Sequence, residues 1–174
     1  TTGAVRYSDV GSYTITPTVG TLTANNYSFS YATGSLAVAQ KALTVTGSSV
    51  TTKTYDGTTA ATITGGTLVG VVNSDAVSLT QAGTFASANY SASAISVTAS
   101  DSLSGAKAGN YTLTQPTGLS GTINKAVLTV TADNKNITYG DLIPTLTATI
   151  TGYVNSESSS VLGGAASITT GAVR

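Results

Sequence analysis

A long internal repeat constrains this chain more than any other feature of its sequence. The stretch KALTVTGSSVTTKTYDG at residues 41–57 returns as KAVLTVTADNKNITYGD at residues 125–141, a step of 84 positions. Further on, GVVNSD at residues 70–75 returns as GYVNSE at residues 152–157, a step of 82. A fixed period found in several separate places indicates an array of small folding units rather than one large core.

A longer period is superimposed on the first. The hexapeptide TTGAVR occupies both residues 1–6 and residues 169–174, a step of 168, which is twice 84. We therefore predict two related module types that alternate in a longer array. Residues 41–124 form a complete module B, residues 125–174 the front of a module A, and residues 1–40 the back of the preceding module A.

Because module A is split between the two ends of the chain, each end is predicted to be an incomplete module. Residues 1–40 and 125–174 each lack the strands that would cover their apolar faces, and in an array they belong to different A modules. In the isolated chain we expect strand exchange between chains, a fragment ordered by its neighbours, or fraying.

Short alternating runs of apolar and polar residues make up most of the chain, as in Leu43–Thr46 and Tyr111–Thr114. This period of two, rich in β-branched residues and interrupted by Gly-containing turns, is typical of half-buried strands. We predict an all-β fold of tandem small β-sandwich, immunoglobulin-like modules. The stretch DVGSYTI at residues 9–15 resembles a tyrosine corner, in which the Tyr13 hydroxyl bonds back to nearby backbone.

Helical signals are confined to one segment. NSESSSVL at residues 155–162 has the pattern of a single short turn, with Asn155 or Ser156 as its cap and Gly163 at its end. A ubiquitin-like β-grasp with this segment as its helix is the alternative fold for one module type.

The composition limits the classes of partner and of chemical site that the chain is expected to have. Charged residues make up 8% of the chain, the net charge is zero, and His and Cys are both absent. No basic stripe is present, so neither nucleic acid nor membrane is an expected partner, and no disulfide, zinc or redox site is expected. A cysteine-free, charge-poor β protein suits an extracellular place on a bacterial cell surface.

Two groups of motifs carry a family resemblance. KTYDGTTAATITGGTLVGVVNSD (53–75) and SGAKAGNYTL (104–113) resemble the YDG-type repeat domain of large bacterial surface proteins. NKNITYGDLIPTLTATITGYVNSE (134–157) resembles the YGX-type MBG domain, whose back half corresponds to VGSYTITP (10–17) and NNYSFSYATGSLAV (25–38). The resemblance implies filamentous-haemagglutinin-like adhesins exported by two-partner secretion, in which such modules alternate in long stalks that act in attachment and biofilm cohesion.

The recurring tyrosines and turn residues are interpreted as structural positions, a packed Tyr beside an Asp- or Gly-containing turn. The alternative, a ligand or cation contact, stays open for them. These structural motif residues are Tyr13, Tyr55, Asp56, Gly57, Tyr111, Tyr139, Gly140 and Asp141.

Metal and covalent chemistry have weak candidates. Asp133, Asn134, Asn136 and Asp141 lie close together in sequence, but Ca²⁺ prefers more carboxylates than the two found here, so we expect no metal and no cofactor. An isopeptide staple would need a lysine beside a carboxylate and an Asn or Asp; solvated lysines are the expected outcome. The candidate lysines are Lys41, Lys53, Lys125 and Lys135.

The expected function is mechanical. Without His or Cys, and with seven scattered acids, the sequence predicts no catalytic residues and no enzyme. We expect a stalk whose partners are neighbouring repeats of the same protein. One alternative is a module that binds matrix polysaccharide through exposed Tyr31, Tyr90 and Tyr153; another is self-association with the same adhesin on another cell.

Overall fold

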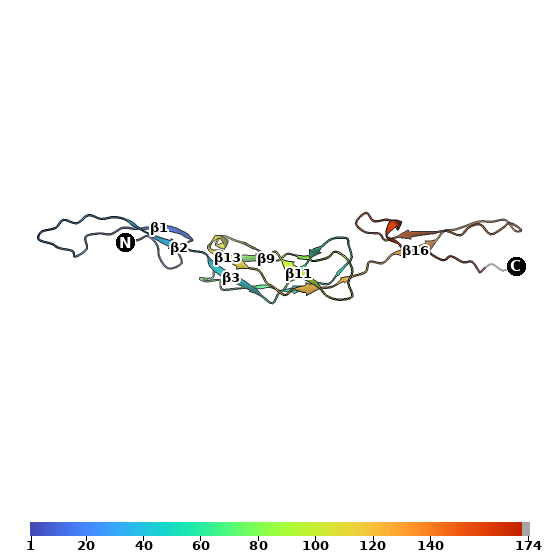
Figure 1. Ribbon diagram of the computed structural model, residues 1–174, viewed down its shortest axis with the longest axis horizontal. Coiled ribbons are helices and arrows are strands. Elements are labelled where there is room, and N and C mark those ends of the chain that lie inside the picture. Colours follow the sequence, from blue (N-terminus) through green and yellow to red (C-terminus); the bar gives the residue numbers. More distant parts are fainter. Residues whose placement is uncertain (172–174) are drawn as a thin grey trace.

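Three β-structured units follow one another along a line in the computed structural model, which describes residues 1–171 (Figure 1). The N-terminal unit, residues 1–40, holds the ribbon of β1 (Gly11–Ile15) and β2 (Gly34–Val38). The C-terminal unit, residues 125–171, holds the ribbon of β16 (Thr129–Ala132) and β17 (Ala148–Thr151). The middle unit, residues 41–124, contains all the other strands, and the N-terminal and C-terminal units lie beyond its opposite ends (Figure 1).

The middle unit is built from many short strands. They are β3 (Lys41–Thr46), β4 (Ser49–Val50), β5 (Lys53–Thr54), β6 (Ala60–Ala61), β7 (Ile63–Thr64), β8 (Thr67–Val69), β9 (Ser78–Thr80), β10 (Gly83–Phe85), β11 (Ile95–Ala99), β12 (Ser102–Ser104), β13 (Tyr111–Thr114), β14 (Ser120–Gly121) and β15 (Ile123–Asn124). Two 3₁₀ turns, η1 (Ala108–Asn110) and η2 (Ser159–Val161), are the helical elements of the described residues. The all-β prediction is therefore confirmed, whereas the immunoglobulin-like arrangement of two facing sheets stays a prediction.

The segment at residues 155–162 differs from its predicted single capped turn. Asn155 and Ser156 adopt left-handed backbone angles, with φ of 50° and 60°, so neither begins a helix. The 3₁₀ turn η2 begins later, and the Ser158 hydroxyl caps it by accepting from Ser160 N. No α-helix is present within residues 1–171, so the β-grasp alternative lacks its central element.

Two parallel strand pairs join the start of the middle unit to its end. β3 lies between β13 and β8, pairing in parallel with β13 at the register Leu43–Leu113 and antiparallel with β8. β5 pairs in parallel with β15. The largest sheet has the order β14-β11-β10-β6 and is antiparallel throughout. Because the first and last strands run the same way, the chain enters the unit at one end and leaves at the other.

The buried side chains of the described residues all lie in the middle unit. Alternate positions of β10 and β11 point inward, and they meet partners from β6, β7 and β15 to form one cluster: Ala61, Ile63, Phe85, Val97, Ala99 and Ile123. Phe85 is 1% exposed and Ile123 is fully buried. Gly121 has a steric role here, since a Cβ at this position would lie 2.6 Å from Val50 Cγ1.

The two outer ribbons have no comparable core. Val130 of β16 is 53% exposed and Ile15 of β1 is 39% exposed. The Tyr13 hydroxyl of β1 donates to the Asp9 carbonyl at 2.8 Å, which is the contact that the tyrosine-corner pattern predicts. Both ribbons therefore leave apolar side chains open to solvent.

The C-terminal ribbon reproduces one strand pair of the middle unit. In β16–β17, Val130 pairs with Ile150; in β3–β8, Val45 pairs with Leu68. The residues of β3 shift by 85 positions to those of β16, and the residues of β8 shift by 82 positions to those of β17, at every pair, so the two ribbons have the same register.

The turns that follow these pairs also match. Gly70 and Gly152 have φ of 106° and 100°, and the Asn-Ser pairs after them are both left-handed. Asp75 N donates to Val72 O, and Glu157 N donates to Val154 O, each at 3.0 Å. The local structure of GVVNSD and GYVNSE is thus the same in the two units, although the middle unit buries a core of side chains and the C-terminal unit does not.

The chain's two phenylalanines give a test of where the core lies. We expect Phe85→Ala to lower the free energy of unfolding by about 3–5 kcal/mol, because it leaves a cavity in the buried cluster. Phe29→Ala is the matched control; Phe29 is 41% exposed, and its removal should change stability by about 0.5 kcal/mol or less. Urea unfolding followed by tyrosine fluorescence measures both, and similar losses for the two variants would contradict this core.

Candidate functional site

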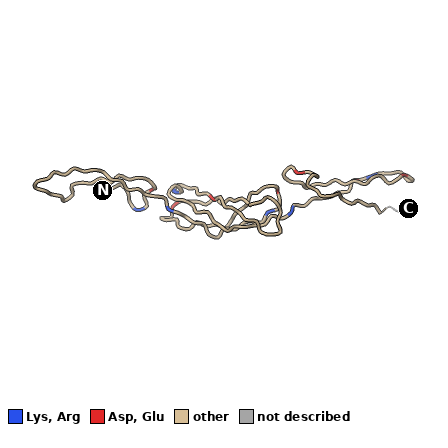
Figure 2. The backbone as a smooth tube through the Cα atoms, viewed as in Figure 1, with Lys and Arg blue, Asp and Glu red and all other residues tan. Residues whose placement is uncertain are grey.

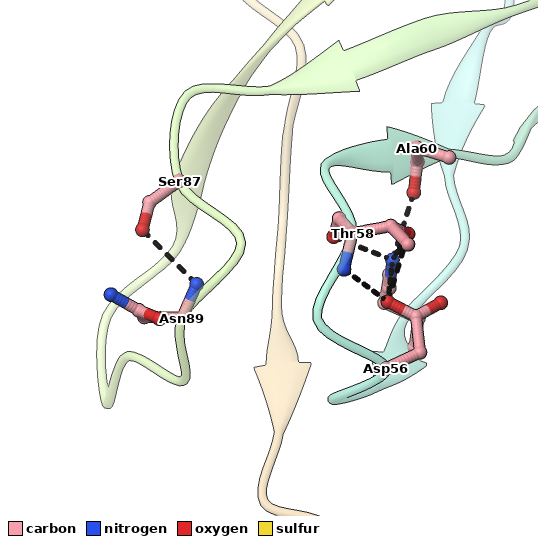
Figure 3. A network of polar contacts seen from close by, with 6 residues as sticks. Asp56, Thr58, Ala60, Ser87 and Asn89 are labelled. Atoms are coloured by element: carbon pink, nitrogen blue, oxygen red, sulfur yellow. Dashed lines mark hydrogen bonds and ion pairs between the residues drawn. The ribbon is translucent and has the colours of Figure 1, made fainter. Parts of the chain in front are cut away.

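The Tyr55-Asp56-Gly57 turn is held together by its own polar groups (Figure 3). Asp56 Oδ1 accepts hydrogen bonds from Thr58 N and Thr58 Oγ1, both at 2.9 Å, and pairs with Lys53 Nζ at 2.7 Å. Lys53 Nζ also donates to the carbonyls of Thr58 and Ala60. Gly57 has φ of 76°, the left-handed conformation that glycine adopts readily.

These contacts stabilise the turn and lower the pKa of the Asp56 carboxyl. The Lys53 ammonium, followed by the two donors of Thr58, holds the pKa of Asp56 at about 2. Lys53 is committed to this turn through three oxygen partners in addition to the carboxylate. These hydrogen bonds and the ion pair therefore fix the backbone conformation of the turn that follows Tyr55.

Tyr55 itself reaches from the middle unit to the C-terminal unit. Its hydroxyl donates to Glu157 Oε1 at 2.5 Å, and this bond is the main cause of a raised pKa for Tyr55. At the same junction, Lys125 Nζ lies 4.8 Å from the centre of the Tyr90 ring, within the range of a cation–π contact. Glu157 was not predicted as a site residue, although the recurrence of VNSD as VNSE marks its position.

An open cleft of about 370 Å³ lies at this junction. Tyr55, Tyr90 and Tyr153 line it together with Lys125 and Glu157, and apolar residues provide most of the remaining wall. The Tyr153 hydroxyl is buried without a hydrogen-bond partner. The cleft thus combines aromatic faces, one cation, one anion and an unsatisfied hydroxyl.

The opposite end of the middle unit has an equivalent junction in which the tyrosine is enclosed. The Tyr111 hydroxyl donates to Asp75 Oδ2 at 2.7 Å and accepts from Val72 N at 3.2 Å. Tyr111 is 4% exposed, and burial is the main cause of its raised pKa. The cleft here, which Tyr7, Lys41, Val72, Asp75 and Tyr111 line with five other residues, measures about 110 Å³.

Polar contacts also tie the N-terminal unit to the middle unit. Asp9 Oδ1 pairs with Lys107 Nζ at 2.7 Å and accepts from Asn110 Nδ2 at 2.6 Å, and Asn110 Oδ1 accepts from Val10 N. The Lys107 and Asn110 contacts lower the pKa of Asp9. Gln40 Nε2 donates to the carbonyl of Tyr111 at 3.2 Å. Figure 2 shows how sparse the charges are, with several of them near the two junctions.

The three tyrosines predicted for ligand binding do not form one group. Tyr90 and Tyr153 share the larger cleft, whereas Tyr31 lies in the N-terminal unit and is 45% exposed. Tyr139, the counterpart of Tyr55, is fully exposed in the C-terminal unit. Tyr55, which was interpreted as a structural residue, joins the cleft instead of Tyr31.

The two acidic calcium candidates, Asp133 and Asp141, accept ordinary hydrogen bonds. Asp133 accepts from the hydroxyls of Thr147 and Thr149, at 2.6 and 2.8 Å, and these bonds lower its pKa. Asp141 accepts from Thr138 N at 3.0 Å. Among residues 1–171, no three His, Cys, Asp or Glu side chains gather in a way that could hold a metal ion. The same part of the chain has no helix long and apolar enough to cross a membrane.

Comparison with known families assigns domains to two stretches of the chain. The model of the YDG domain matches residues 39–118, and the model of the MBG domain (YGX type) matches residues 128–173, so one domain of each kind is detected here. The YDG match falls on the middle unit and the MBG match on the C-terminal unit. No curated protein and no solved structure matches the chain.

The contacts of Asp56 in the Tyr55-Asp56-Gly57 turn predict a loss of stability in acid. In the folded chain the pKa of Asp56 is about 2, below the value near 4 of an unfolded aspartate, so its stabilising contribution is complete above about pH 4 and is lost as the pH falls through about 2. We expect Asp56→Asn to destabilise the chain at pH 6, and the difference from the natural chain to shrink steadily between pH 5 and 2. Denaturant unfolding at a series of pH values measures this, and a difference independent of pH would contradict it.

Proposed function

We propose that this chain is a stalk or spacer segment of a bacterial surface protein, in which YDG and MBG modules repeat to provide reach. The detection of one domain of each kind supports this, as does the in-line arrangement of the three units (Figure 1). The sequence period of 84 and the equal registers of β3–β8 and β16–β17 support a repeated module.

The parallel pairing of β3 with β13 is the observation that carries the proposal. The first strand, β3, pairs in parallel with β13 near the end of the unit, and the last strand, β15, pairs in parallel with β5 near its start. The chain therefore passes through the unit from end to end, so successive units extend in line. Tension applied to the two ends pulls β3 and β13 in opposite directions along their lengths. The hydrogen bonds between them are then loaded together, as a spacer under load requires.

The wider setting follows from the family resemblance. We place the segment in a secreted or surface-anchored adhesin of the filamentous-haemagglutinin type, exported by two-partner secretion and acting outside the cell in attachment and biofilm cohesion. Its partners are neighbouring repeats of the same protein, and its role is not enzymatic. The low charge and the absence of cysteine are compatible with this extracellular role.

A stalk predicts a length that grows by equal steps. Chains carrying one, two and four copies of the 168-residue period should show a maximum dimension that rises linearly, each module adding on the order of 25–40 Å. Small-angle X-ray scattering measures this dimension directly. A compact particle whose size rises only with the cube root of mass would overturn the proposal.

Polysaccharide binding is a second candidate, and the larger cleft is the observation that favours it. Tyr90 and Tyr153 lie in one cleft with a lysine and a glutamate, which suits stacking and hydrogen bonding to a sugar. If this function holds, the chain binds a glycan saturably and Tyr90→Ala weakens that binding about tenfold or more. Tyr31→Ala is the matched control, since Tyr31 is an exposed tyrosine outside the cleft. Equal effects of the two changes, or no saturable binding on a glycan array, would rule it out.

A further inference from the structure

The larger cleft has a smaller counterpart in which one tyrosine, Tyr111, fills part of the space beside the acid. Lys125, Val154 and Glu157 line the larger cleft, and their sequence counterparts Lys41, Val72 and Asp75 line the smaller one. In the smaller cleft Tyr111 sits between Val72 and Asp75, and the volume is about 110 Å³ compared with about 370 Å³. The larger cleft therefore has the walls of a tyrosine-binding site without the corresponding tyrosine.

The counterpart of Tyr111 is Tyr27, 84 positions earlier. Tyr27 lies at the far end of the molecule from the larger cleft, in the N-terminal unit, and is 81% exposed, whereas Tyr111 is 4% exposed. The sequence around both is similar, NNYSFSY in one and GNYTLTQ in the other. An exposed tyrosine and a vacant tyrosine site thus occupy opposite ends of the same chain.

The backbone segment next to the larger cleft, residues 125–128, has no parallel strand beside it within residues 1–171. In the middle unit Lys41 and Ala42 of β3 pair with Tyr111 and Thr112 of β13. Their counterparts Lys125 and Ala126 precede β16, which has β17 as its only strand partner among residues 1–171. Val127, next in line, is 81% exposed. One edge of this segment is open to an added parallel strand.

We propose that the cleft receives Tyr27 of a second copy of this chain, whose residues 27–30 add as a parallel strand beside the segment that begins at Lys125, in which Val127 is one residue more than β3 has. The pairs set by the middle unit are Tyr27 with Lys125 and Ser28 with Ala126. The Tyr27 hydroxyl then donates to Glu157, as Tyr111 donates to Asp75, and accepts from Val154 N, as Tyr111 does from Val72 N. Strand addition of this kind combines backbone hydrogen bonds with one side-chain anchor.

Glu157 is able to serve two tyrosines at once. Tyr55 of its own chain occupies Oε1, and an ionised carboxylate accepts at both of its oxygens. The acid then links three segments: the end of one module, the front of the next, and the strand that arrives from the second copy. The resulting contact is head to tail, because it joins the N-terminal unit of one copy to the C-terminal unit of another, and each further copy adds in the same way.

Cysteine pairing tests the register without disturbing the core. The chain has no cysteine, and Thr112 and Ala42, the counterparts of Ser28 and Ala126, face solvent. The variant with both Ser28→Cys and Ala126→Cys should form a ladder of disulfide-linked oligomers under mild oxidation, at least tenfold faster than a control with Thr23→Cys and Ala126→Cys. Equal rates for the two, or a disulfide formed within a single chain, would overturn the proposal.

The hydroxyl–carboxylate contact is tested by sedimentation of the full chain. Tyr27→Phe and Glu157→Gln should each weaken the concentration-dependent association about tenfold, and the double variant should be little weaker than either alone, because both remove one bond. Tyr31→Phe is the control and should associate like the natural chain. A chain that stays monomeric at all concentrations, or additive losses in the double variant, would count against the contact.

The same oligomers separate this inference from the function on which it rests. Linked oligomers that are long and thin support both, whereas linked oligomers that are compact retain the tyrosine site and overturn the stalk. A linear increase in length for tandem copies without specific cross-linking retains the stalk and overturns the tyrosine site.

Discussion

The parallel pairing of β3 with β13 is the constraint on which the rest of the structure depends. It joins residues about 70 positions apart, at the register Leu43–Leu113, and buries Leu43 completely. An antiparallel closing pair would bring both ends of the unit to the same side. The parallel pair instead separates them, places Tyr111 at the first junction, and leaves Tyr55 at the second through the related pairing of β5 with β15. The linear shape and the positions of both tyrosine–acid contacts follow from this pairing.

The sparse charges of the chain are used mainly to hold turns and junctions. Every one of its seven acids accepts a side-chain or backbone hydrogen bond, and these acids are Asp9, Asp56, Asp75, Asp101, Asp133, Asp141 and Glu157. Exposed pairs of this kind contribute little to stability by themselves. Their effect is to select one conformation of each loop, so that short strands with few apolar residues meet at a defined register.

The sequence was sufficient for the parts of the structure that depend on local pattern. Alternation predicted an all-β chain, and the spacing of Tyr13 after Asp9 predicted the hydrogen bond between them. The helical turn was misplaced, because the left-handed Asn155 and Ser156 form a tight turn and leave Ser158 as the cap. Contacts across long separations, such as Tyr55 with Glu157, depend on which strands pair in parallel, and periodicity carries no information on that choice.

The difference between the units shows what a module of this type needs in order to fold. The C-terminal unit has the counterparts of β3, β8 and the turn after β8, all in the conformations of the middle unit, yet none of its described residues is buried. Local pairing and turn geometry are therefore already satisfied without the strand that corresponds to β13. Burial is not achieved, because residues 125–171 have no strands beyond β16 and β17. In the middle unit β6, β7, β10, β11 and β15 form the buried cluster, and β13 pairs beside the buried Leu43. A module of this type therefore needs both the strands of the buried cluster and the parallel strand β13, since the pair that corresponds to β3–β8 leaves its apolar side chains exposed by itself.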